Sequence, residues 1–397
     1  MVVHSAASAI RVSGGVLNLG AMVLANNTAD TGACLHASDG AVVTLRMVRV
    51  EGSTATGGGG GGGGGVAIRG ATLLFNTGVT ITGCHADGGS GGGVLCEDCV
   101  IAPVAGSDAR LLLRGNSAQR GGNLALVGVT AVGYIDATMG AAVVGAGVAV
   151  AIDGVANLSA VAVFANTASG AWSLGAPSND SAWHAEPATG GGVYIAGGAT
   201  VVIMDGESSV AGNTAETGAG VFVASGATIT GALNVTGNSA CTRGGGVHVD
   251  SGGTLDGLTV HGNCAGCCGP LHPPFGTVVA GGGGVSTAGA GTCTLHGVMV
   301  VGNTLPNSVS NLAGGGMLAV GVGAVVSLDA CSVTGNVAFG NGGGVAAMDG
   351  ASIAAAGGST NRPWSTVVAH NTAHGCGGGV VVSAAASVTG LLVRDNR

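Results

Sequence analysis

The sequence of 397 residues contains no lysine. Its eleven basic residues are all arginines, and against 19 acidic residues they leave a formal net charge of −8. A nucleic-acid interface needs clustered cations that neutralise phosphates, and an anionic membrane attracts proteins through the same charges. We therefore expect no nucleic-acid partner and no electrostatic attraction to a membrane surface.

Aromatic residues make up only 3% of the chain and charged residues only 8%. A core built around Phe, Tyr and Trp is therefore not available, and small or β-branched aliphatic residues must fill the interior. The 83 glycines follow no strict Gly-X-Y period, which excludes collagen. A mean hydropathy of +0.57 argues against disorder.

Long hydrophobic runs are absent as well. The first residues, 1–7, lack the charged segment and the apolar run of a secretory signal. The longest apolar stretch without a charged residue, 137–152, has about 16 residues, whereas roughly 20 are needed to span a bilayer. We expect no transmembrane helix, and membrane association only through segments that this sequence does not include.

What the sequence has in abundance is an internal repeat. A motif of the form aliphatic-x-x-Asn recurs along the chain. A second motif follows it, in which a glycine cluster precedes an aliphatic residue. Asn213 to Asn238 and Asn238 to Asn263 are both 25 residues. Three short aliphatic runs between Gly and Asn corners fit one coil of a parallel β-helix. We predict an all-β fold, a single right-handed parallel β-helix over 1–397 with roughly 13 coils of about 25 residues. The sequence stops in mid-repeat, so we expect a fragment of a longer protein.

The recurring asparagines are predicted to be structural. A β-helix corner needs positive φ, which Gly adopts freely and Asn at the lowest cost among residues with a side chain. Stacked Asn amides can also bond one another and satisfy buried polar groups. Val221, Val247, Val345 and Val380 should likewise stack as an interior column. The predicted ladder comprises Asn27, Asn116, Asn166, Asn213, Asn238, Asn263, Asn303, Asn336, Asn371 and Asn396.

Four segments depart from the repeat and are predicted to be loop insertions, near 167–190, 264–280, 304–313 and 357–366. Three of them leave from the same corner of the coil and should project from one edge. Loops of solenoid proteins often form the binding face. The candidate binding residues in these loops are Trp172, Trp183, His184, His272, Phe275 and Trp364.

Eleven cysteines are an odd number, so at least one is unpaired. Two groups have C-x-x-C spacing, and each could form a loop disulfide or remain as thiols, while the second could also ligate a metal. We favour disulfides and expect no metal. Four others, Cys34, Cys84, Cys293 and Cys331, are expected to be small interior residues. The two groups are Cys96 with Cys99, and Cys264 with Cys267 and Cys268, which His261 and His272 flank.

The aliphatic-x-x-Asn motif and the glycine-cluster motif alternate over most of residues 20–397. One example of the pair is Val235-Thr-Gly-Asn238 and Gly244-Gly-Gly-Val247. The alternation resembles the repeats of the polymorphic outer-membrane proteins, whose hallmark pair is Phe-x-x-Asn and Gly-Gly-Ala-Ile/Leu/Val. Here Val or Leu replaces Phe, and Gly commonly replaces Ala. The resemblance implies a pectin-lyase-like right-handed β-helix in a secreted or surface-displayed passenger that serves adhesion or surface coating.

Right-handed β-helices also host polysaccharide lyases and glycoside hydrolases. Glycoside hydrolysis needs two carboxylates at a defined separation, and the lyase route needs Ca²⁺ carboxylates and a cationic base. The acids here are scattered, and many precede Gly as in turns. No Ser-His-Asp or Cys-His grouping is visible. We expect no catalytic site and no cofactor.

The sequence thus favours a non-enzymatic β-helix that is extracellular or at the cell surface, in an outer membrane or cell wall, as the fold and the cysteines suggest. It would act as a structural spacer or an adhesion module, with glycans or surface proteins as partners. The alternatives are a carbohydrate-active enzyme of the pectin lyase or polygalacturonase type, and a degenerate β-helix without a ligand. Two carboxyl groups within about 5 to 9.5 Å in a groove would favour the enzyme.

Overall fold

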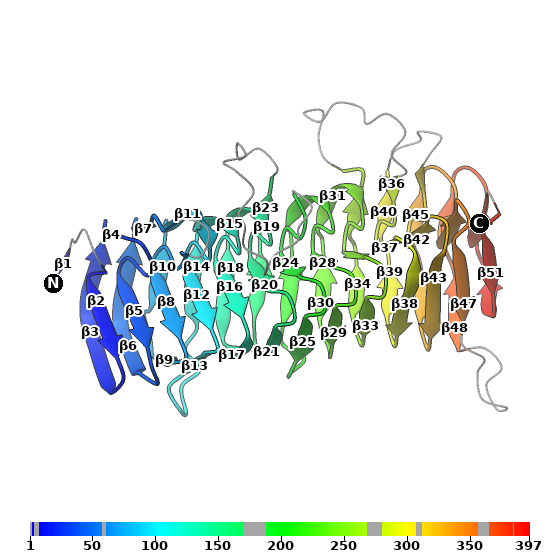
Figure 1. Cartoon of the computed structure of the whole chain (residues 1–397). Helices are drawn as coiled ribbons and strands as arrows, with labels where there is room; N and C mark the ends of the chain where they lie inside the picture. The colour runs from blue at the N-terminus through cyan, green and yellow to red at the C-terminus, as the bar shows by residue number, and fades with distance from the viewer. Residues whose placement is uncertain are drawn as a thin grey trace. The chain divides into compact units, whose positions relative to one another are not determined.

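The computed structural model describes residues 2–3, 8–57, 61–169, 188–267, 280–306, 312–355, 365–383 and 385–397. These residues contain no helix, and the strand pairings among them are parallel. They divide into two compact units, Met1–Ser209 (unit 1) and Val210–Arg397 (unit 2). Figure 1 shows each unit as a stack of short strands. The prediction of an all-β parallel solenoid is confirmed, with about 12 turns instead of roughly 13.

One turn of unit 2 illustrates the repeat. It runs through β31 (Ser239–Arg243), β32 (Val247–Val249), β33 (Thr254–Asp256) and β34 (Thr259–His261). β31 belongs to a narrow sheet, here sheet C, and β32 to a second one, sheet B. The remaining two strands share the wide sheet A and are separated by a kink at Gly257, whose φ is 78°. The three aliphatic runs of the sequence therefore become three sheets, the third of which is bent.

The valines that open the strands of sheet B form the expected interior column. Val221 on β28 (Val221–Val223) pairs in register with Val247, which pairs with Val285 on β37 (Val285–Ala288). The column continues through Met317, Val345 and Val380. Apart from Val380 these residues are buried, as a narrow aliphatic core requires.

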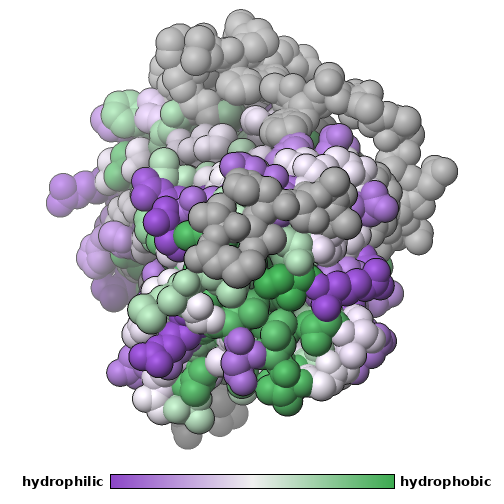
Figure 2. All heavy atoms as spheres, turned by 90° about the vertical axis from the view of Figure 1, so that its left-hand side faces the viewer, coloured by the Kyte–Doolittle hydropathy of each residue, from purple (hydrophilic) through white to green (hydrophobic). Residues whose placement is uncertain are grey.

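The same apolar interior is visible in unit 1. Figure 2 faces the end of this unit that holds β2 (Ile10–Ser13) and β3 (Val16–Ala25), and it shows apolar side chains gathered between hydrophilic ones. In β3, Leu19 and Leu24 are buried while Asn18 is exposed. Strand alternation thus sends aliphatic residues inward and polar residues outward.

The left-handed corner residue is not the ladder asparagine, contrary to our prediction. It is the residue before it, for example Gly237 with φ 61° and Gly262 with φ 62°. Where no glycine stands there, other residues adopt the same conformation, including His370 with φ 56° and Ala165 with φ 54°. The ladder asparagines are therefore selected for their side chains and not for their backbone conformation.

In unit 2 the predicted ladder is continuous. The Asn263 Oδ1 accepts bonds from both the backbone N–H and the Nδ2 of Asn238, each at 2.9 Å. The Nδ2 of Asn263 donates to the Val235 carbonyl and to the Asn303 Oδ1. The same pattern, at 2.8–3.0 Å, links Asn213, Asn238, Asn263, Asn303, Asn336, Asn371 and Asn396. All of them except Asn396 are buried.

In unit 1 the ladder is mixed. Asn27 and Asn116 do not meet, because Ser53 and Cys84 occupy the ladder position in the turns between them. The backbone N–H of Asn27 donates to the Ser53 Oγ at 3.1 Å, and the backbone N–H of Cys84 donates to the Asn116 Oδ1 at 2.9 Å. Between Asn116 and Asn166 the ladder position holds Gly140.

Asn123, which the sequence pattern did not identify, closes that last gap. It stands where other corners have their third glycine, and its side chain accepts from the Asn116 Nδ2 and donates to the Asn166 Oδ1, both at 2.9 Å. A Cβ at an ordinary third glycine, such as Gly246, would lie 2.8 Å from the Nδ2 of the ladder asparagine. A side chain at the third-glycine position and an asparagine at the ladder position of the next turn would therefore collide. One of the two side chains is enough to continue the ladder between neighbouring turns.

Candidate functional site

The residues predicted to bind a ligand through the loops lie outside the described part of the chain. This holds for Trp172, Trp183, His184, His272, Phe275 and Trp364. Three segments lie outside the described residues at a similar point of the repeat. In each case the strand before the segment belongs to sheet C, and the chain then continues to a strand of sheet B. These segments are 170–187, 268–279 and 307–311. The strands before and after 356–364 both belong to sheet A. In chain order, each of the first three segments therefore falls between a strand of sheet C and the next strand of sheet B, and the predicted insertions themselves lie outside the described residues.

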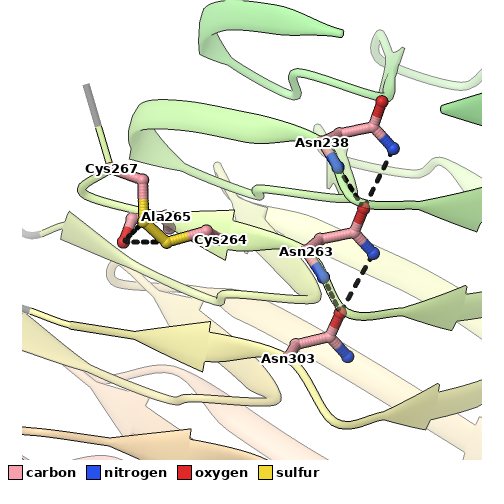
Figure 3. The surroundings of a disulfide bond; sticks show 6 residues. All are labelled: Asn238, Asn263, Cys264, Ala265, Cys267 and Asn303. Atoms are coloured by element: carbon pink, nitrogen blue, oxygen red, sulfur yellow. Dashed lines mark hydrogen bonds between the residues drawn. A yellow bond between two sulfur atoms is a disulfide. The ribbon is translucent and has the colours of Figure 1, made fainter. Parts of the chain in front are cut away.

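Both C-x-x-C groups form disulfides. Cys96 bonds Cys99 at the corner after β12 (Val94–Glu97), and Cys264 on β35 (Cys264–Ala265) bonds Cys267. Cys241 is disulfide-bonded as well, and Cys268 lies outside the described residues. Figure 3 shows the second disulfide beside the ladder formed by Asn238, Asn263 and Asn303. The four single cysteines predicted to be interior are buried and free.

Two of those buried thiols have a polar role that the sequence did not indicate. The Cys34 Sγ lies 3.0 Å from the Ser53 Oγ and accepts from the Asn27 Nδ2 at 3.3 Å. Burial raises the pKa of Cys34, and it raises the pKa of Cys84 to about 12. Both side chains therefore stay protonated and complete the ladder of unit 1 where asparagine is missing.

A row of ionisable side chains lies on the outward face of sheet A in unit 2. Asp256 on β33, His296 on β38 (Gly291–His296) and Asp329 on β43 (Ala324–Asp329) are in register on three successive turns. The His296 Nδ1 lies 2.8 Å from an Asp256 oxygen, and its Nε2 lies 3.7 Å from an Asp329 oxygen. All three side chains are about half exposed, at 45–55%. We call this set the polar row.

The polar row escaped sequence analysis because its members are 40 and 33 residues apart. Neither separation is a multiple of the period of about 25, since insertions interrupt both turns. Only the register across β33, β38 and β43 brings the three side chains together. Two turns of a parallel stack separate the outer carboxylates by roughly 9.5 Å.

We expect the Asp256→Asn variant to lower the pKa of His296. The hydrogen bond from His296 to Asp256 and the charge of that carboxylate raise the pKa of the imidazole above its ordinary value. The neutral amide removes the charge, so the imidazole should lose its proton at lower pH. Titration of the His296 ring signals by NMR measures the change. The Asp349→Asn variant is the control, and an unchanged midpoint in Asp256→Asn would contradict the assignment.

A Ser-His-Asp grouping is present, although we predicted none. The His248 Nδ1 lies 2.6 Å from the Ser286 Oγ, and its Nε2 lies 3.1 Å from the Asp250 Oδ1. Ser286 is fully buried and His248 is 4% exposed, with Phe222 stacked on the ring at 5.0 Å between centroids. A nucleophile must reach its substrate, and this hydroxyl cannot. The grouping satisfies a buried imidazole and is structural.

Within the described ranges, no cluster of three or more His, Cys, Asp or Glu side chains has the arrangement of a metal site. The same residues include no helix with the length and hydrophobicity to cross a membrane. No known family model matches the chain, and no curated protein matches it significantly. The polar row is thus the best-defined exposed set of ionisable side chains from which to argue function.

Proposed function

We propose that the chain is a non-enzymatic β-solenoid module, extracellular or at the cell surface, that acts as a stiff spacer and presents side chains for adhesion. The observation that carries this proposal is the continuous ladder of unit 2. Each link fixes one turn to the next through buried hydrogen bonds that run along the stack. A frame of this kind resists bending and keeps outward side chains in fixed register.

Location outside the reducing cytosol is supported by the disulfides. Disulfides persist in oxidising compartments and are rare where glutathione keeps thiols reduced. The similarity of the repeats to those of polymorphic outer-membrane proteins points the same way. We propose on these grounds a secreted or surface-displayed module.

The partners that we propose are glycans or surface proteins. The polar row offers two carboxylates and an imidazole at fixed spacing, and sugar hydroxyls donate to such groups. The Met299 side chain, which is 48% exposed on the neighbouring strand β39 (Met299–Val301), adds an apolar surface. The predicted loop residues would contribute further contacts.

A second candidate is a carbohydrate-active enzyme, and one observation favours it. The outer carboxylates of the polar row, on Asp256 and Asp329, are separated by two turns, or roughly 9.5 Å, which is near the upper end of the spacing in inverting glycosidases. In that case one carboxyl group would protonate the leaving oxygen and the other would activate water. His296 lies between them, where the sugar would have to bind.

A glycan and polysaccharide array with the purified chain, run beside a reducing-sugar release assay on the same panel, tests both candidates. Binding without release supports the adhesive module. Release that is lost in Asp256→Asn and retained in Asp349→Asn would overturn it in favour of the enzyme. Silence in both assays removes the adhesive role toward glycans and leaves the spacer.

A further inference from the structure

Two disulfides of identical C-x-x-C spacing lie in opposite surroundings. Cys96 and Cys99 are 0% and 2% exposed, whereas Cys264 and Cys267 are partly exposed. Ala265 points into the core, so strand alternation turns Cys264 to the outward side of sheet C. An external thiolate must reach a sulfur atom before exchange can occur. Burial therefore closes the first disulfide to solvent thiols and leaves the second open.

The backbone around the exposed disulfide is held independently of its sulfur atoms. The amide of Cys264 donates to the Asn238 carbonyl at 2.9 Å, and the amide of Cys267 donates to the Ala240 carbonyl at 3.2 Å. Asn263, which precedes Cys264, is fixed by the ladder on both sides, as Figure 3 shows. Reduction of the disulfide breaks none of these bonds. The two thiols would stay neighbours, with their Cα atoms 5.9 Å apart.

We propose that Cys264 and Cys267 form a redox-active disulfide that exchanges with external low-molecular-weight thiols. A thiolate attacks one of the two sulfur atoms, the S–S bond breaks, and the other cysteine leaves as a thiolate that takes up a proton. A second thiolate then displaces the first cysteine and yields the small disulfide and the protein dithiol. Two thiols are oxidised and one protein disulfide is reduced. The small disulfide restores the protein disulfide by the reverse steps.

The test uses the full chain, purified without reductant and treated with reduced glutathione under native conditions. Free thiols are then alkylated and mapped by peptide mass spectrometry. We expect Cys264 and Cys267 to be reduced faster than Cys96 and Cys99 by about tenfold or more. The far-ultraviolet circular dichroism should stay unchanged, and oxidised glutathione should reverse the labelling.

Two variants sharpen the result. Treated with oxidised glutathione, the Cys267→Ser variant should trap a mixed disulfide between Cys264 and glutathione, with release of one glutathione thiol, because the second cysteine that would displace the bound glutathione is missing. A double variant, Cys96→Ser with Cys99→Ser, should keep the exchange rate at Cys264 and Cys267. Equal reduction rates for both disulfides, or reduction of the exposed one only after unfolding, would overturn the proposal. Neither result bears on glycan binding, so failure here is distinct from failure of the proposed function.

Discussion

Replacing Asn263 with alanine should lower the free energy of unfolding by about 3 to 5 kcal/mol. The buried Asn263 Oδ1 accepts two hydrogen bonds from Asn238, and its Nδ2 donates to the carbonyl of Val235 and to the Asn303 side chain. Alanine leaves the backbone N–H of Asn238 without its acceptor, and it removes one of the hydrogen bonds made by the Asn238 Nδ2, the Val235 carbonyl and the Asn303 Oδ1. In an apolar interior each unpaired group costs about 1 to 3 kcal/mol. Urea denaturation followed by circular dichroism measures the change.

The matched control is Asn234→Ala, which removes the same amide from an exposed position on β30 (Asn234–Thr236). We expect a change within about 0.5 kcal/mol. Asn396→Ala should give an intermediate loss, because its partly exposed side chain can bond water instead. Equal effects at Asn234 and Asn263 would show that the ladder contributes no particular stability.

The fold was predictable because its determinants are local and repeated. The aliphatic column through Val221, Val247 and Val345 follows from the position of each valine after a glycine cluster. The assignment of positive φ to asparagine was wrong, because the sequence offers Gly and Asn side by side at each corner. Only the backbone of the pairs such as Gly237 and Asn238 shows that the glycine is the left-handed residue.

The candidate site was not predictable, for a reason of register. His248 and Ser286 are 38 residues apart, and the separation contains a segment whose length does not follow the repeat. The polar row has the same difficulty, since His296 reaches Asp256 only across an interrupted turn. Pairing in a parallel solenoid depends on which turn a residue occupies, and insertions hide that count in the sequence.

Asn123 was not predicted as a ladder residue, because it stands in the glycine cluster and not in the aliphatic-x-x-Asn motif. Its side chain takes the place of the asparagine that is absent at Gly140. A Cβ at Gly140 would lie 2.5 Å from the Asn123 Nδ2 and 2.3 Å from the Ala146 carbonyl oxygen. The turn therefore cannot hold a side-chain amide at both positions, and an asparagine at position 140 would also require the Ala146 carbonyl to move. Similarly, Cys34 occupies a third-glycine position where the ladder residue is the short Ser53.

This arrangement predicts a strong coupling between Asn123 and Gly140. Asn123→Gly alone should cost about 2 to 4 kcal/mol, because it leaves the side-chain amides of Asn116 and Asn166 without a bridge. Gly140→Asn alone should also destabilise the protein, by steric conflict with Asn123. The double variant should be more stable than the Gly140→Asn variant, since the new asparagine fills the vacated space. Thermal and urea unfolding of the four proteins give the coupling energy.

Recovery should be incomplete, because the Ala146 carbonyl must still move to admit a Cβ at position 140. Gly115 provides the matched control, since a Cβ there meets nothing within 4 Å although its φ is 62°. The effects of Gly115→Asn and Asn123→Gly should add, because the two changes share no steric conflict. Additivity at both glycines would mean that the bridge by Asn123 is incidental. A favourable coupling at Gly140 alone would show that Asn123 and an asparagine at position 140 compete for the same space between Asn116 and Asn166.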